Sequence, residues 1–326
     1  MKHIFIVNPA AGKGKHIPSL LASITYACED LKVEYDIYHT HAVGDATEHV
    51  SDVCKQNPDK KFRFYACGGD GTLSEVLNGA VGHDNAEIAV IPMGTGNDFV
   101  KTFRHPEYFS EIQRQVRGVA QKFDLLKYND RYSLNIVNAG FDCDVVCKVA
   151  QIKRNAFVPS KLAYIMGIFS VFTKPLGKRF KVTVDDGECI ENDFMLCAMA
   201  NALYYGGGFK AAPLAKLNDG YMDLCLVDIV SRWDFIRIIP KYKAGKHVDE
   251  NGNSPYPFVH YRKCKKVVIE SENTLGICGD GEVTQINRVV VEVIPSAIAF
   301  SIPKDSDCIS AETDGSEHGK DIASVS

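Results

Sequence analysis

Three glycine-containing segments carry residue types that could handle a phosphate group. The first, Cys67-Gly68-Gly69-Asp70-Gly71-Thr72, joins a strand-like alternating run to apolar residues at helical spacing. Its glycines let the backbone turn sharply beside a bulky anion, and unpaired N–H groups at a helix start attract phosphate. The Asp70 carboxylate would repel phosphates unless a cation lay between, so the segment indicates a nucleotide with Mg2+. The alternative is an ordinary Gly-Asp-Gly turn.

The second segment, Pro92-Met93-Gly94-Thr95-Gly96-Asn97-Asp98-Phe99, repeats the order of strand, glycine turn and helix. Asn97 or Asp98 could simply cap the helix predicted to begin near Phe99. Alternatively, Gly94 and Thr95 contribute further contacts to a phosphate or a ribose. We favour these contacts because the first segment is predicted to lie nearby.

The third segment, Gly279-Asp280-Gly281-Glu282, follows almost two hundred residues later. Two acids one residue apart in a glycine-rich turn could face one site, one as a general base and the other as its partner or a metal ligand. A β-turn with two solvated acids is the alternative.

The elements that would position these segments differ between the two halves of the chain. Up to about residue 124, strands and helices alternate, which predicts a parallel sheet with ligand loops at the carboxyl ends of its strands. The expected strands are Lys2–Val7, Glu34–His39, 62–67 and Glu87–Pro92, and the expected helices include Ile17–Leu31 and Asp45–Gln56. Glycine loops 8–15, 68–72 and 93–97 would then share one edge.

The second half has mainly strand-like runs separated by turn signals. These runs are 132–139, 180–185, 194–201, 222–229, 266–270 and 288–294, with a helix expected near 160–173. The sequence therefore predicts an α/β nucleotide-binding domain over 1–124 and a mainly antiparallel, β-sandwich-like domain over 125–303. Residues 304–326 contain six acids and few large apolar residues, which predicts a disordered tail.

Composition restricts the class of protein. A hydrophobic content of 45% is typical of a globular chain, and a net charge of −4 gives no general attraction to nucleic acid. The 11 scattered cysteines suggest reduced thiols in a cytoplasm, without a disulfide framework or zinc site. A strand at the N-terminus leaves no room for a signal peptide, and the uncharged stretch 194–209 is too short to span a membrane.

Together these motifs resemble the diacylglycerol kinase catalytic-domain family, which includes soluble bacterial lipid kinases, sphingosine kinases and ceramide kinases. The matching segments are Asn8-Pro9…Gly12-Lys13-Gly14, Gly68–Thr72, Gly94–Asp98 and Asp280-Gly281-Glu282, in the family's order. The resemblance covers roughly residues 2–303. It implies an ATP- and Mg2+-dependent kinase that phosphorylates the hydroxyl of a membrane lipid, most simply diacylglycerol, to give phosphatidic acid.

The resemblance also implies a set of site residues. The ATP site would comprise Asn8, Pro9, Ala10, Ala11, Gly12, Thr40, Gly68, Gly69, Asp70, Gly71, Thr72, Glu75, Gly94, Thr95 and Asn97. Asp70 would act through Mg2+ on the phosphates. The base that takes the proton of the lipid hydroxyl would be Asp280 or Glu282, which the resemblance implies jointly and does not separate.

A further loop, Lys216-Leu217-Asn218-Asp219-Gly220-Tyr221, resembles the family's structural Mg2+ loop. There the Asp219 carboxylate would bind the ion, together with the backbone carbonyls of Lys216 and Tyr221. The alternative is an Asn-Asp-Gly hairpin turn, which these residues would also form well.

The acceptor site is less clearly marked. Lys153–Lys181 contains seven basic residues and no acid, and apolar residues within it fall on one helical face. Such a helix could rest on anionic lipid or frame a hydrocarbon tunnel, or pack into the core of the β domain. Arg232–His247 and His260–Lys266 are further basic, apolar stretches.

Two other functions remain open at this point. NAD kinases share the Gly-Gly-Asp-Gly-Thr turn, and a regulator that binds a nucleotide or lipid could have lost catalysis. We expect a cytoplasmic protein at the inner face of the membrane, without a transmembrane segment or a nucleic-acid partner. The resemblance also implies a homodimer.

Overall fold

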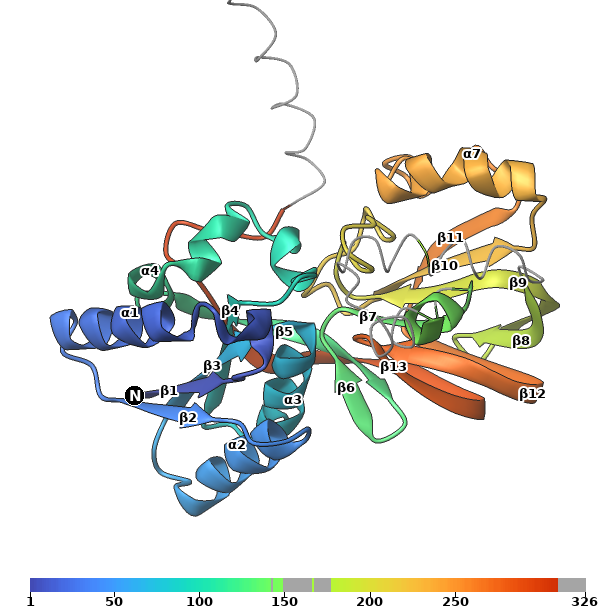
Figure 1. The fold of residues 1–326 in the computed structure, drawn as a ribbon. Coiled ribbons are helices and arrows are strands. Elements are labelled where there is room, and N and C mark those ends of the chain that lie inside the picture. The colour runs from blue at the N-terminus through green and yellow to red at the C-terminus, as the bar shows by residue number, and fades with distance from the viewer. Residues whose placement is uncertain (142, 149–165, 167–176, 310–326) are drawn as a thin grey trace, which may run out of the picture.

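The computed structural model describes residues 1–141, 143–148, 166 and 177–309. Figure 1 shows an α/β part that contains the N-terminus beside a mainly β part, with the long strand β13 (Glu282–Ile302) reaching between them. This order confirms the fold class predicted from the sequence. The predicted helix near 160–173 lies outside the described residues, apart from residue 166.

Four parallel strands form the sheet of the α/β part, in the order β4-β3-β1-β2. The strands are β1 (Lys2–Val7), β2 (Tyr35–His39), β3 (Phe62–Gly68) and β4 (Ala86–Pro92). Each differs by at most one residue at either end from its predicted range. Their apolar residues run almost without interruption because both faces of a parallel sheet are buried.

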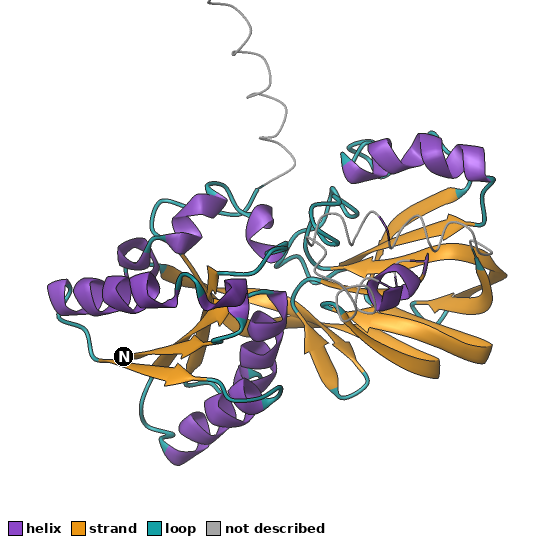
Figure 2. Cartoon of the chain, in the orientation of Figure 1, coloured by secondary structure: helices purple, strands orange, loops and turns teal. Residues whose placement is uncertain are grey.

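Helices cover both faces of this sheet, as Figure 2 shows. They are α1 (Ile17–Asp30), α2 (Asp45–Gln56), α3 (Asp70–Ala80) and the short α4 (Ile112–Val116). Successive residues of a strand point to opposite faces. Ile4 and Ile6 therefore pack in the cluster that contains α2 and α3 residues, whereas Phe5 and Val7 pack in the cluster that contains α1 and α4 residues.

The mainly β part is antiparallel. Its elements are β5 (Val119–Tyr128), β6 (Arg131–Ser133), β7 (Ile136–Gly140), β8 (Lys178–Val184), β9 (Glu188–Ala200), β10 (Met222–Asp228), α7 (Arg232–Lys243), β11 (Val259–Cys264) and β12 (Lys266–Gly279). The prediction of a single strand over 132–139 is wrong, because two strands, β6 and β7, occupy this range. The chain changes partners there, because β6 pairs with β5 whereas β7 pairs with β9 and β12.

Strand β13 makes the two parts share one sheet. Its end pairs in parallel with β4, Ala299 opposite Glu87, and antiparallel with β5, while its beginning pairs with β12. The predicted domain boundary after residue 124 falls inside β5 and stays a prediction. The described segment 304–309 also returns to the α/β part, where Cys308 forms a bridge with Phe103. Disorder predicted from residue 304 onward is thus wrong for these six residues, because Cys308 packs against the core.

Among the described residues, no helix combines the length and apolar character needed to cross a membrane.

Candidate active site

The loops that follow the four parallel strands meet at one edge of the sheet. Asn8 follows β1, Thr40 follows β2 and Gly69 follows β3. The backbone N–H of Asn8 donates to the carbonyl of Cys67, and that of Met93, after β4, donates to the carbonyl of Gly68 at 2.8 Å. These bonds carry the parallel ladder into the loops, so the predicted grouping of the glycine loops is observed.

Glycine is required where two of these loops touch. A Cβ atom on Gly94 would lie 2.6 Å from the Cα of Gly69, closer than real side chains approach backbone. A Cβ on Gly68 would lie 2.2 Å from Oγ1 of Thr72. The two loops therefore present backbone, not side chains, beside the N-terminus of α3, which is the arrangement that binds phosphate in other folds.

Asp70 fixes the second glycine loop against the first. It begins α3, and its Oδ2 and Oδ1 accept the backbone N–H groups of Asn97 and Asp98, both at 3.0 Å. Burial and the negative charge of Asp98 raise the pKa of the Asp70 carboxyl. A Cβ on Gly96 would lie 2.7 Å from Oδ2, so the loop also needs glycine to pass this carboxylate.

The polar side chains of the loops mainly hold the loops themselves. Asn97 has a left-handed backbone, φ 48°, and its side chain exchanges two hydrogen bonds with the backbone of Gly94, at 3.0 and 2.8 Å. Nδ2 of Asn8 donates to Oγ1 of Thr72 at 3.1 Å. Thr95 is exposed at the loop tip, where a ligand could reach it.

Glu75 lies on α3 and contacts helix α2 instead of the glycine loops. Its carboxylate accepts the backbone N–H of Ala46 at 3.3 Å, and its carbonyl accepts the hydroxyl of Thr47 at 2.9 Å. Both partners lie in the first turn of α2. The structure thus uses Glu75 to join α3 to α2, and a nucleotide contact from this residue stays a prediction.

Asp280 enters the same site from the other part of the chain. It occupies the two-residue turn between β12 and β13, where Gly279 pairs with Glu282. Its Oδ1 accepts the Ser133 hydroxyl at 2.7 Å and the backbone N–H of Ile136 at 3.3 Å. Burial raises the pKa of this carboxyl to about 6, and the negative charge of Asp70 contributes to the rise. The charge of Asp70 thus acts on Asp280, although the two acids come from different parts of the chain.

Glu282 points elsewhere. Its side chain is 41% exposed and forms an ion pair with Arg131 on β6. The sequence analysis did not distinguish Asp280 from Glu282. In the structure the first carboxylate binds Ser133 and Ile136, and the second forms its ion pair with Arg131.

The Lys216–Tyr221 loop already contains a cation partner for its carboxylate. Nζ of Lys263 lies 2.8 Å from Oδ2 of Asp219 and 2.9 Å from Oδ2 of Asp223, whose side chain is fully buried. Oδ1 of Asp219 accepts the backbone N–H of Tyr221. Nowhere in the described part of the chain do three or more His, Cys, Asp or Glu side chains gather as metal ligands. Lys263 therefore occupies Oδ2 of Asp219 in this structure, and a metal role for Asp219 with the carbonyls of Lys216 and Tyr221 stays a prediction.

Sequence reasoning missed two acids that organise this region. Asp124 is buried, and its carboxylate accepts the backbone N–H groups of Gly220 at 2.6 Å and Ser296 at 2.8 Å. Asp98, considered only as a helix cap, accepts the backbone N–H of Gly207 at 2.7 Å. Asp98 ties the α/β part to a loop of the β part, whereas Asp124 ties β5 to the loop before β10 and to β13. Neither acid has a sequence signal that reveals its distant partner.

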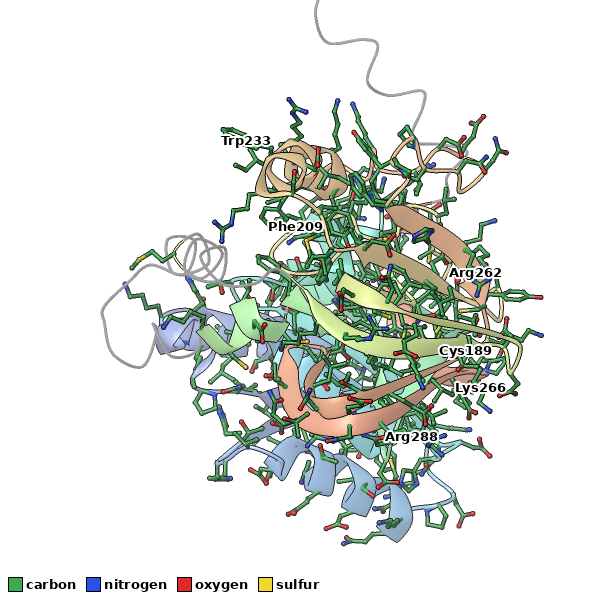
Figure 3. All side chains as sticks on the ribbon, turned by 90° about the vertical axis from the view of Figure 1, so that its right-hand side faces the viewer. Cys189, Phe209, Trp233, Arg262, Lys266 and Arg288 are labelled. Carbon is green, nitrogen blue, oxygen red and sulfur yellow. The ribbon has the colours of Figure 1, made fainter. Side chains whose placement is uncertain are left out.

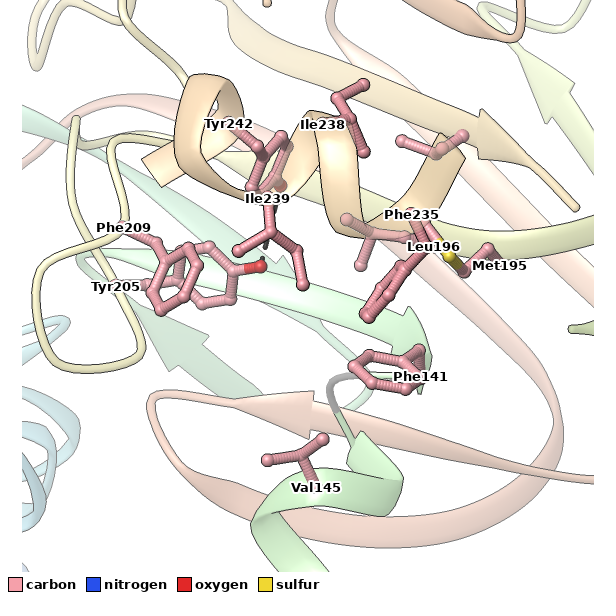
Figure 4. Close-up of a pocket in the computed structure, with 11 residues that line it drawn as sticks. Phe141, Val145, Met195, Leu196, Tyr205, Phe209, Phe235, Ile238, Ile239 and Tyr242 are labelled. Atoms are coloured by element: carbon pink, nitrogen blue, oxygen red, sulfur yellow. Dashed lines mark hydrogen bonds between the residues drawn. The ribbon is translucent and has the colours of Figure 1, made fainter. Parts of the chain in front are cut away.

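An apolar pocket lies in the β part beneath α7, as Figure 4 shows. It encloses about 580 Å3, including space open to solvent. Its walls include Phe141, Met195, Tyr205, Phe209, Phe235 and Ile239. The pocket was not predicted, because its complete lining, which also includes Val227, comes from five separate segments of the chain.

Comparisons with known proteins agree with this arrangement. The family model described as the diacylglycerol kinase catalytic domain matches residues 2–128, and the YegS C-terminal NAD kinase beta sandwich-like domain matches residues 135–302. A diacylglycerol kinase of Staphylococcus saprophyticus is 30% identical over 285 residues, covering 85% of this chain and 87% of that protein. One of Staphylococcus aureus (strain JH9) is also 30% identical, with 85% and 84% covered. A crystal structure of a putative diacylglycerol kinase from Bacillus anthracis has a TM-score of 0.72 at 25% identity, covering 92% of this chain and 96% of that one.

Proposed function

Because the chain belongs to the diacylglycerol kinase family, whose members transfer a phosphoryl group to an alcohol, we propose that it phosphorylates diacylglycerol from ATP. Two observations support this proposal: the glycine cradle with Asp70 at the N-terminus of α3, and the Asp280 carboxyl, whose pKa is raised by burial and by the charge of Asp70. A kinase needs a phosphate site, charge neutralisation and a base near the acceptor hydroxyl. The cradle and Asp70 meet the first two needs, and Asp280 meets the third.

Asp280 is the base in this proposal. Its pKa near 6 keeps it ionised at neutral pH yet basic enough to accept a proton. As the lipid oxygen bonds to the γ-phosphorus, its proton passes to the carboxylate of Asp280. The bond from phosphorus to the bridging oxygen breaks, and its electron pair leaves with ADP. Ser133 and the N–H of Ile136 hold the carboxylate in place.

The residues present fit a nucleotide that brings its own metal ion. Mg2+ is usually held by one or two carboxylates together with phosphates and water, so a full protein cage is not needed. Asp70, whose pKa is raised by burial, is the carboxylate beside the α3 N-terminus that would meet such an ion. Bound there, Mg2+ would neutralise charge on the phosphates. Asp70 also positions the loop 94–98 through its two backbone hydrogen bonds.

The pocket beneath α7 supports a lipid acceptor. Strand β7 runs from Asp280 to the pocket. The backbone N–H of Ile136, at its beginning, donates to Asp280, and Phe141, which directly follows its end, lines the pocket. Five residues of extended chain span about 17 Å. A lipid with its hydroxyl at Asp280 could therefore place an acyl chain among the apolar walls. We also propose that the protein works at the inner face of the membrane, where such a lipid is found, and forms a homodimer.

The test is transfer of labelled phosphate from ATP to a panel of acceptors: diacylglycerol in mixed micelles, sphingosine, ceramide, phosphatidylglycerol and NAD, each with and without Mg2+. Asp280→Asn serves as the matched control. Mg2+-dependent label in diacylglycerol that the variant loses is the expected result. Label in NAD alone, or in no acceptor, would overturn the proposal, while label in another lipid would replace the acceptor and keep the chemistry.

A further inference from the structure

The helix α7 has two dissimilar faces. Phe235, Ile238 and Tyr242 are buried against the sheets and line the apolar pocket. The helix begins at a cap in which Ser231 accepts the backbone N–H of Asp234 at 3.1 Å. Figure 3 shows Trp233 on the side of the helix that points away from the sheets. This face is exposed in the part of the chain that the structure describes.

Large apolar side chains gather on this outward face. Ile229, Trp233 and Ile236 are 49%, 74% and 52% exposed. The three-residue spacing of Trp233 and Ile236 places them on one side of α7, and Ile229 lies just before the helix cap. They are three of only nine exposed large apolar residues in the described ranges, and the others are dispersed along the chain. Such a cluster marks a contact with another surface.

Positive charge surrounds the cluster. Arg237 and Lys241 follow Trp233 at four-residue spacing, and both are exposed without an ion pair to any described residue. Lys243 is also exposed. The acid of the helix, Asp234, bonds to the hydroxyl of its own cap at 2.6 Å. The outward face therefore combines an indole and isoleucines with cations, the composition of helices that lie in the interface of anionic bilayers.

We propose that the outward face of α7 docks on an anionic lipid bilayer. This inference rests on the proposed function and adds the surface through which the lipid reaches the site. Docking would bring the pocket, lined by the inner face of the same helix, next to the membrane. A second copy of the chain fits less well, because a twofold contact would set Arg237 and Lys241 opposite their own copies.

Trp233 is the single tryptophan of the chain, so tryptophan fluorescence, excited selectively over that of the tyrosines, reports on this face alone. Vesicles of 30% phosphatidylglycerol in phosphatidylcholine should shift its emission to the blue, and brominated lipid should quench it. Vesicles of phosphatidylcholine alone should produce much smaller changes. Emission that stays unchanged with anionic vesicles, or shifts with protein concentration in their absence, would overturn the proposal.

Variants test the charges and the apolar contact separately. The double variant Arg237→Gln/Lys241→Gln should weaken vesicle partitioning about 30-fold, because each cation near an anionic surface contributes about 1 kcal/mol of binding free energy. Ile236→Ser should weaken it about tenfold. Matched controls are Tyr26→Ser, an exposed apolar residue on α1, and Lys60→Gln, and neither should change partitioning. Equal effects of the controls and the α7 variants would contradict the assignment.

A second assay on the unaltered protein distinguishes a failure of membrane docking from a failure of the proposed kinase activity. Its phosphorylation of a dispersed short-chain diacylglycerol needs no bilayer. Activity on that substrate with no fluorescence response to vesicles would refute docking and leave the kinase function. A fluorescence response without transfer to any acceptor would support docking and refute the proposed function.

Discussion

Replacing Asp280 by Asn should lower activity and at the same time stabilise the fold. Burial raises the pKa of this carboxyl from 3.8 to about 6. A difference of that size corresponds to about 3 kcal/mol by which the ionised carboxylate destabilises the native state at neutral pH. Asn keeps an oxygen for the Ser133 hydroxyl but adds N–H donors that need partners, at about 1 kcal/mol. The net expected gain is about 2 kcal/mol.

The sign of the pH dependence follows from the raised pKa. Above about pH 6 the carboxyl is ionised in both the folded and unfolded states, so the wild type bears the full cost of burying the charge. Below about pH 4 the carboxyl is protonated in both states and that cost vanishes. The variant should therefore be the more stable protein by about 2 kcal/mol above pH 6. Below about pH 4 it should be the less stable one by about 1 kcal/mol, because only the cost of the added N–H donors remains there.

Urea unfolding of both proteins at pH 4, 5, 6 and 7.5 measures this difference. In parallel, turnover should fall by a factor of about 10² to 10⁴, and the wild-type rate should decline tenfold per pH unit below about 6. A variant that is no more stable than the wild type at pH 7.5, or a difference independent of pH, would refute the argument that burial sets the pKa. Near-normal turnover would refute the role of Asp280 as base.

Three further changes test other parts of the site. Glu282→Gln should alter kcat by less than about threefold in a steady-state assay, because its carboxylate is exposed and forms a surface ion pair; a loss as large as that of a base would refute this. Gly94→Ala should raise the KM for ATP at least about tenfold, since the new methyl group meets the backbone of Gly69, and an unchanged KM would mean that the two loops separate freely. Lys263→Met should lower the free energy of unfolding by about 3 kcal/mol, because it leaves a buried carboxylate unpaired. The control Lys266→Met removes only exposed ion pairs and should cost less than about 1 kcal/mol, and equal losses would contradict the buried-pair argument.

Most of the α/β part could be predicted from the sequence, because its signals are local. Glycine turns directly after buried apolar runs identify the strands and place the turns at one edge, and the observed bounds of β1 to β4 agree closely with the predicted ones. The prediction of the β part was less accurate. Strand β5 was missed, and β13 extends far beyond the predicted 288–294, because edge and central strands are defined by partners distant in the chain.

The candidate site divides in the same way. Asp70 and Asp280 were recognised as site residues from their glycine turns, yet nothing in the sequence separated Asp280 from Glu282. The partners supplied by the fold separated them: Asp280 accepts hydrogen bonds from Ser133 and Ile136, whereas Glu282 forms an ion pair with Arg131. Likewise, nothing in the sequence indicated that Lys263 of β11 forms an ion pair with Asp219, and the metal role of this loop stays a prediction.

The sequence by itself determined the segments that approach a phosphate, because a strand, a glycine turn and a helix start are encoded within about ten residues. Only the tertiary structure decided what those segments face. Asp70 and Asp280 are about 210 residues apart, and β13 must return to β4 before their charges influence each other. The pKa of Asp280, the pocket and the outward face of α7 depend on burial, and burial is a property of the assembled fold.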